Sequence, residues 1–284
     1  LTDLTDTAGE LFLGLSMGCA RCHNHKFDPI LQKDYYRLRS FFTPVHWRDD
    51  LKLATPAEKK AFGEQEARWE AATAEIRAKM DALTKPDIDA RVKTWRVSFT
   101  EDLQAMTLKP AEERDALEKQ LAGLCERQLD FARGSFDPIK DIKSEKARAE
   151  YKALKEELNK FQHLKPKPLP DAFVATDAGP EAPANRLKTR KGDLEIEPGF
   201  LAIVDPNPPK ITPTQTSTGR RRALADWITR ADNPLSTRVI VNRVWQYHFG
   251  RGIVSSASEF GTLGELPSHP ELLDFLTARF VAGG

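Results

Sequence analysis

Two cysteines and a histidine lie within five consecutive residues near the start of the chain, as Cys19-Ala20-Arg21-Cys22-His23. This C-x-x-C-H spacing keeps two thiols and one imidazole within about one turn of chain. In c-type haem attachment the thiols add to the two vinyl groups of the haem and the adjacent imidazole binds the iron, so the three groups must lie that close together. The motif therefore predicts haem c, with Cys19 and Cys22 as the thioether links and His23 as the proximal iron ligand.

Three other interpretations of the motif stay open at this point. Zinc also binds cysteine and histidine, and His25 follows closely, but a structural zinc site takes a second ligand pair, and the sequence has no other C-x-x-C and no H-x-x-x-H. A thioredoxin-like dithiol would follow a strand, and no strand is predicted before the motif. The third interpretation is a buried pair of thiols beside a histidine.

The sixth iron position has several candidate ligands. His46 ends the same predicted unit and is favoured by its proximity in the sequence. The other candidates are water and three side chains, Met17, His248 and His269. His25 lies too close behind His23 to reach the opposite haem face, so we expect it, with Arg21 and Lys26, near a haem propionate.

Composition removes several other classes of function. The chain has 43 basic and 42 acidic residues, which indicates neither a nucleic-acid partner nor an acidic substrate. No apolar run approaches the roughly 18 residues of a membrane span. Three cysteines do not make a disulfide scaffold, and the common sequence motifs of serine hydrolases, nucleotide-binding proteins and zinc proteases are missing. The sequence begins at Leu1 and ends at Gly284 in a manner that favours a part of a longer protein.

The pattern of apolar residues predicts a mainly α-helical protein in four segments. Residues 1–50 are expected to hold the haem motif between two short helices, the first starting near Thr7 and Glu10 and ending at Gly18, the second running over 34–42. Residues 51–165 predict long helices, residues 166–218 a Pro/Gly-rich irregular segment with short strands, and residues 219–284 a C-terminal helical unit.

The middle segment predicts an antiparallel helical bundle or coiled-coil-like insertion. Thr55 and Glu58 form a capping box before the first long helix, and Pro86 and Pro110 are expected to start new helices. Short connections between such helices favour antiparallel neighbours. The side chains expected to pack in these helices include Trp69, Trp95, Leu117, Leu121, Leu124 and the thiol of Cys125.

The last segments have clearer boundaries. Helices are expected over residues 220–229, 236–249 and 270–280, the last one capped by Ser268-His269-Pro270-Glu271. The apolar run at 200–204 is expected to be a short strand within irregular chain. The run Arg220-Arg221-Arg222 opens a helix, where it could bind an anion, and a solvated helix face is the favoured interpretation.

Two parts of the sequence resemble a known family. The first comprises Phe12-Leu13-Gly14-Leu15, then Gly18-Cys19-Ala20-Arg21-Cys22-His23-Asn24-His25-Lys26-Phe27-Asp28-Pro29-Ile30 and Gln32-Lys33-Asp34-Tyr35-Tyr36. It resembles the end of the cytochrome-like domain of large secreted planctomycete proteins. The second comprises Asn233-Pro234-Leu235, Arg238-Val239, Val241-Asn242-Arg243-Val244-Trp245-Gln246, Phe249-Gly250-Arg251-Gly252-Ile253-Val254, Phe260-Gly261, Gly264-Glu265 and Pro267-Ser268-His269-Pro270-Glu271-Leu272-Leu273-Asp274. It resembles the domain of unknown function that follows in the same family.

The resemblance implies an exported, periplasmic or cell-envelope protein with haem c, connected with polysaccharide breakdown. Asn24 departs from the family pattern, in which an aspartate is expected, and this leaves the iron ligand unchanged. Three functions are therefore carried forward. The first is electron transfer with a redox partner protein, the second is a haem-dependent oxidoreductase acting on carbohydrate-derived substrates, and the third is a non-enzymatic interaction module with a structural haem or zinc.

Overall fold

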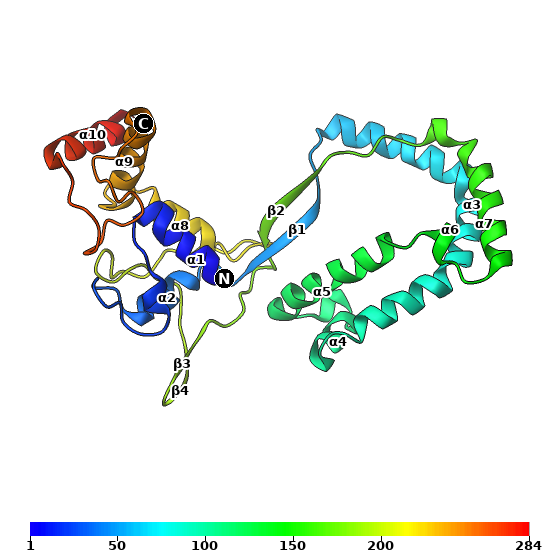
Figure 1. The fold of residues 1–284 in the computed structure, drawn as a ribbon, viewed down its shortest axis with the longest axis horizontal. Coiled ribbons are helices and arrows are strands. Elements are labelled where there is room, and N and C mark those ends of the chain that lie inside the picture. Colours follow the sequence, from blue (N-terminus) through cyan, green and yellow to red (C-terminus); the bar gives the residue numbers. More distant parts are fainter. Residues whose placement is uncertain (284) are drawn as a thin grey trace. The chain divides into compact units, whose positions relative to one another are not determined.

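The computed structural model describes residues 1–283, which form two compact units (Figure 1). The first unit combines Leu1–Val45 with the chain from Asp177 onward, and the second unit is His46–Thr176. Both are mainly α-helical, as the sequence predicts. Of the four segments expected from the sequence, the first and the last share one unit, together with most of the third.

The first unit contains the motif and both segments that flank the middle of the chain. Its helical elements are α1 (Thr2–Ala8), one π-helical turn η1 (Gly9–Leu13), one 3-10 turn η2 (Gly18–Arg21), α2 (Gln32–Arg39), α8 (Arg220–Ile228), α9 (Ser236–Phe249) and α10 (Pro270–Gly283). The three C-terminal helices begin at the residues that the sequence predicts, within a residue or two.

The first helix differs from the prediction. It begins at Thr2, so Thr7 lies inside α1 and does not cap it. The face that carries Thr5 and Ala8 is buried, and α1 contacts α2, so packing fixes a start more than one turn earlier than the capping pattern indicates. The helix ends at Gly14 and not at Gly18, because Gly14 has a φ of 62°, which glycine adopts without strain.

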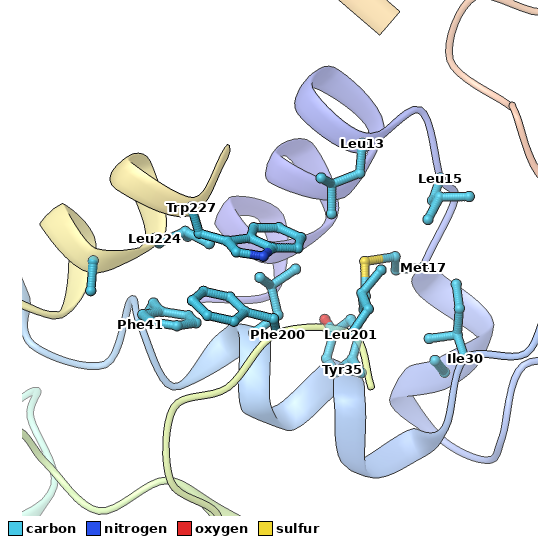
Figure 2. Packing of buried hydrophobic residues seen from close by; sticks show 13 residues of the cluster. Leu13, Leu15, Met17, Ile30, Tyr35, Phe41, Phe200, Leu201, Leu224 and Trp227 are labelled. Atoms are coloured by element: carbon cyan, nitrogen blue, oxygen red, sulfur yellow. The ribbon is translucent and has the colours of Figure 1, made fainter. Parts of the chain in front are cut away.

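The core of the first unit joins residues that are far apart in the sequence. The ring of Phe200 stacks on Phe41 with 5.6 Å between centroids and on Trp227 with 4.6 Å (Figure 2). The buried members of this core are Leu13, Leu15, Met17, Ala20, Ile30, Tyr35, Leu38, Phe41, Phe200, Leu201, Ala223, Leu224 and Trp227. The N-terminal segment, the chain near residue 200 and α8 therefore bury one common apolar core.

Two predictions for the first unit are corrected here. Residues 200–204 form turns and not a strand, since Phe200 and Leu201 both point into the core. The arginine run is only partly solvated. Arg220 donates to the carbonyl and the hydroxyl of Ser40, and Arg221 pairs with Asp177 at 3.0 Å, which leaves Arg222 on the exposed face.

Two small antiparallel ribbons complete the strands. In the first, β1 (Val45–Lys52) pairs with β2 (Asp171–Asp177) where the chain enters and leaves the second unit. In the second, β3 (Arg186–Thr189) pairs with β4 (Gly192–Glu195), with Leu187 opposite Leu194. No strand is predicted over the residues of β1, because six of its eight residues are exposed and four are charged.

The second unit is built on one long helix. Its helical elements are α3 (Pro56–Arg96), α4 (Glu101–Leu108), η3 (Ala111–Glu113), α5 (Ala116–Gly134), α6 (Pro138–Asp141), α7 (Glu145–Asn159) and η4 (Gln162–Leu164). The predicted capping box is confirmed, because the Thr55 hydroxyl accepts the Glu58 N–H and the Glu58 carboxylate accepts the Thr55 N–H. No helix within residues 1–283 is both long enough and apolar enough to cross a membrane.

The predicted break at Pro86 is wrong, because α3 continues through it. A proline inside a helix removes one backbone hydrogen bond and crowds the preceding turn. Packing offsets this cost, since α3 contacts both α5 and α7 and buries residues on either side of the proline, such as Met80 and Val92.

The buried face of α5 also differs from the prediction. Leu117 and Leu124 are exposed, and the residues that pack inward are Ala122, Cys125, Leu129 and Ala132. Small side chains on this face let neighbouring helices approach closely. The thiol of Cys125 is buried, as expected, and burial raises its pKa.

Candidate functional site

The C-x-x-C-H motif is held on the surface by the 3-10 turn η2 and the residues that follow it. Cys19 and Cys22 are both exposed, and the N–H of Cys22 donates to the carbonyl of Cys19 at 3.3 Å. Ala20, between them, is fully buried in the core, as is Met17 just before η2. The apolar anchors fix the turn from beneath, so both thiols project away from the core.

The imidazole of His23 is exposed, and one of its two ring nitrogens contacts a backbone carbonyl. Its Nδ1 lies 2.6 Å from the carbonyl oxygen of Asn24. In the tautomer that satisfies this contact, Nδ1 donates to the carbonyl and Nε2 is left as the free lone pair. Metal-binding histidines commonly donate their second ring nitrogen in this way, because the bond fixes the tautomer and the orientation of the ring.

The chain after the motif is tied to the start of α2. The side-chain oxygen of Asn24 accepts the N–H of Gln32 at 3.0 Å, and the side-chain amide of Gln32 donates to the carbonyl of Arg21 at 3.2 Å. Asn24 therefore has a structural role that needs an acceptor oxygen. An aspartate could supply the same acceptor, so the departure from the family pattern preserves this contact.

Two buried side chains close the loop below the motif. His25 and Asp28 are almost completely buried, and Nδ1 of His25 accepts the N–H of Asp28 at 2.9 Å. The ring of His25 faces the interior and is held by the loop itself, and the expectation that it lies near a haem propionate stays a prediction. Arg21 and Lys26, the other expected propionate partners, remain exposed.

Charged and polar groups near the motif already have contacts of their own. The side chain of Arg21 contacts Cys22, and this hydrogen bond raises the pKa of the guanidinium. The ammonium of Lys26 lies 5.0 Å from the ring centre of Phe27. Beneath the motif, burial raises the pKa of the Tyr35 phenol to about 12, and the charge of Asp6 acts in the same direction.

The candidate sixth ligands nearest to the motif in the sequence are Met17 and His46. Met17 is completely buried, so its sulfur is a core group and is not presented with the motif. His46 belongs to the second unit, where a Cβ added at Gly123 would lie 2.8 Å from its Cε1. Burial lowers the pKa of His46, and the charge of Arg127 lowers it further. The assignment of His46 to the iron stays a prediction.

The remaining candidates and the apolar surroundings lie in the first unit. His248 and His269 are both exposed, on α9 and just before α10. Phe27 and Leu31 are exposed by nearly half, although they belong to the loop that follows the motif. Exposed apolar side chains at this place suit a large apolar ligand, because its binding would remove them from water.

The donor groups at the motif are of the kinds that haem c attachment uses. Haem attachment requires two accessible thiols and one imidazole nitrogen, and Cys19, Cys22 and His23 present these groups on one exposed turn. A structural zinc ion takes four protein ligands. Within the part of the chain that the structure describes, no three His, Cys, Asp or Glu side chains gather closely enough to hold a metal ion.

Sequence reasoning missed the residues that support the motif from below. The sequence carries no local signal for the burial of Asp28 or for the hydrogen bond between Asn24 and Gln32. An aspartate before a proline is a frequent turn signal. Its burial depends on chain that is more than two hundred residues away, since its carboxylate accepts the N–H of Thr262.

Comparisons with known proteins identify the two ends of the chain. A family described as a protein of unknown function (DUF1549) matches residues 1–47, and a second one, also described as a protein of unknown function (DUF1553), matches residues 220–284. Both are planctomycete-type domain families. No curated protein and no solved structure matches the chain. The matched residues lie almost entirely in the first unit, which also contains the motif.

Proposed function

We propose that this chain is a c-type haem-binding protein of the cell envelope that transfers electrons in support of polysaccharide catabolism. The observation that supports the proposal is the C-x-x-C-H spacing on exposed chain, where both thiols are accessible and Nδ1 of His23 is bonded to a backbone carbonyl. We assign residues 1–50 to the end of a cytochrome-like domain, and we assign α3 to α7 to an antiparallel bundle that serves as a spacer or partner surface.

The roles of the residues follow from their chemistry. The thiols of Cys19 and Cys22 would hold the group covalently, and Nε2 of His23 would bind the iron. Haem bound in this way supplies a one-electron redox centre. The carbonyl of Asn24 orients the imidazole through Nδ1, while Phe27 and Leu31 would shield part of the bound group from water. An exposed site of this kind suits exchange of electrons with a partner protein.

The first experiment tests covalent attachment. The protein is expressed together with a c-type haem maturation system, and the denatured chain is stained for haem after electrophoresis. We expect a Soret band and haem that stays on the wild-type chain. The double replacement of Cys19 and Cys22 by serine should abolish staining. Cys125→Ser is the matched control, since this buried thiol lies in the other unit and should leave staining unchanged.

A colourless wild-type protein under these conditions would overturn the proposal. Haem content that is unchanged in the double serine variant would do the same, because attachment would then not depend on the motif. His23→Ala separates attachment from ligation. We expect this variant to keep the thioether bonds but to change the absorption spectrum, because the iron would lose its proximal nitrogen.

A second function is favoured by the surroundings of two candidate ligands. Met17 is buried in the core, and the ring of His46 lies against Gly123. A sixth position without a protein ligand would suit a haem-dependent oxidoreductase that acts on carbohydrate-derived substrates. Carbon monoxide added to the reduced haem protein separates the two functions. Rapid binding with a large Soret shift favours the oxidoreductase, and an unchanged spectrum favours electron transfer.

A further inference from the structure

A buried carboxylate lies directly behind the motif, and its partners come from the other end of the chain. The side chain of Asp28 is 5 % exposed. One of its oxygens accepts the backbone N–H of Thr262 at 2.7 Å, and the other lies 3.2 Å from Nδ1 of His25. Burial of a carboxylate costs free energy unless hydrogen bonds compensate it. Here the compensation comes from chain between α9 and α10.

The segment that binds Asp28 also contacts the chain before the motif. The N–H of Phe260 donates to the carbonyl of Gly14 at 2.6 Å, and the hydroxyl of Thr262 donates to the carbonyl of Phe27 at 3.4 Å. Residues 14 and 27–28 stand on the two sides of the motif in the sequence. Residues 260–262 therefore hold both ends of the chain that carries Cys19, Cys22 and His23.

The close approach requires glycine at position 261. A Cβ added to Gly261 would lie 2.7 Å from each carboxylate oxygen of Asp28. Real Cβ atoms do not approach other atoms so closely, and Asp28 has no room to retreat because it is buried. Any larger residue at position 261 would push the carboxylate and the loop away from the C-terminal segment.

We propose that Asp28 is a positioning residue through which the C-terminal segment fixes the haem-binding loop. This inference rests on the proposed function insofar as the ligand is haem. The carboxylate holds residues 260–262 against the loop, and the loop is closed by the N–H of His25, which donates to the carbonyl of Ile30 at 2.8 Å. The closed loop sets the position of Asn24 and hence the direction of the His23 imidazole. The two matched segments thus build one haem site together.

The test perturbs the contact from both sides. Asp28→Asn keeps the shape but removes the charge, and Gly261→Ala adds the obstructing Cβ. Asp274→Asn is the matched control, since this carboxylate pairs with Arg238 in the same unit but is exposed and distant in sequence from the loop. Amide hydrogen exchange is measured on each protein without haem. We expect exchange in residues 23–31 to rise at least roughly tenfold in both test variants and to stay at the wild-type rate in the control.

The haem-loaded proteins supply a readout that a merely structural role would not change. We expect Asp28→Asn and Gly261→Ala to shift the midpoint potential and the ligand-sensitive bands of the oxidised spectrum in the same direction, with the control unchanged. Wild-type exchange in the loop together with wild-type spectra in both variants would overturn the proposal. If Asp28→Asn does not fold, the result for Gly261→Ala alone tests the proposal. If neither variant folds, Thr262→Val is measured in their place, because it removes only the hydrogen bond to the carbonyl of Phe27.

The two proposals fail in different ways. In one outcome the wild-type protein never acquires haem, while amide exchange in residues 23–31 still rises in the variants. This outcome would refute haem binding and support the positioning role. The opposite outcome is haem staining that depends on Cys19 and Cys22, while loop exchange and spectra stay unchanged in the Asp28 and Gly261 variants. This outcome would refute the positioning role and support haem binding.

Discussion

Replacing Trp227 by alanine removes the ring through which α8 packs against the N-terminal segment. The indole is 4 % exposed and stacks on Phe200, which in turn stacks on Phe41. Burial of an indole removes roughly 200 Å² from water at about 25 cal/mol per Å², or ~5 kcal/mol. Partial relaxation of the cavity lowers this figure, so we expect a loss of about 4 kcal/mol in the free energy of unfolding of the first unit.

The informative measurement is which helices exchange their amides faster after this loss of stability. If residues 1–45 and the chain from Asp177 form one cooperative unit, slow amide exchange should accelerate in α2 as well as in α8. A loss of 4 kcal/mol corresponds to roughly a thousandfold increase for amides that exchange through unfolding of the unit. Trp227→Phe, which keeps an aromatic ring in the stack, should cost about 1–2 kcal/mol and accelerate the same amides less.

Two results would refute this reasoning. Accelerated exchange confined to α8 and α9, with α2 unchanged, would mean that the two matched segments fold independently. A loss below about 1 kcal/mol would mean that the aromatic stack contributes little to the packing of α8 against the rest of the first unit. Amides of the second unit serve as the internal control, since the shared core contains residues of the first unit alone.

Three further predictions concern other parts of the molecule. Burial tends to raise the pKa of Asp177, but hydrogen bonds from Ser217 and Thr218 outweigh it and lower the pKa. In thermal melts at neutral pH, Asp177→Asn should therefore be less stable than the wild type. This difference in stability should vanish as the pH falls through the lowered pKa. Pro86→Ala restores a helical hydrogen bond and should stabilise the second unit by about 2 kcal/mol in urea titrations. In the haem-free protein, an alkylating reagent should modify the exposed thiols at least roughly tenfold faster than Cys125, as followed by mass spectrometry.

The features that sequence predicted well are those set by local chain. The capping box at Thr55 and Glu58 forms as expected, and α9 has the bounds that its pattern indicates. Cap residues and helical periodicity act over a few positions, so they can be recognised without knowledge of the rest of the fold.

The features that sequence missed depend on distant partners. β1 lacks an alternating pattern, and it is a strand because β2 supplies its hydrogen bonds. On α5 the leucines at 117 and 124 are exposed, while Ala122 and Ala132 are buried, since close helix packing selects small residues. The stack of Phe41, Phe200 and Trp227 joins three separate segments, and no local pattern reveals which segments will share a core. The burial of Asp28 was missed for the same reason.

The chain enters and leaves the second unit at one place. Removing this unit is therefore a direct test of the division into two units. The N–H of Ala178 donates to the carbonyl of Pro44 at 2.8 Å, so the chain ends that border residues 46–176 are already adjacent. A two-residue Asn-Gly turn joins strands that are paired in this way. We expect a protein in which Asn-Gly replaces residues 46–176 to fold and to keep slow amide exchange in α2. A matched deletion of residues 54–169 keeps the ribbon of β1 and β2. If only this second variant folds, the ribbon is required by the first unit, and if neither folds, the first unit depends on the helices of the second and the division into two units does not describe folding.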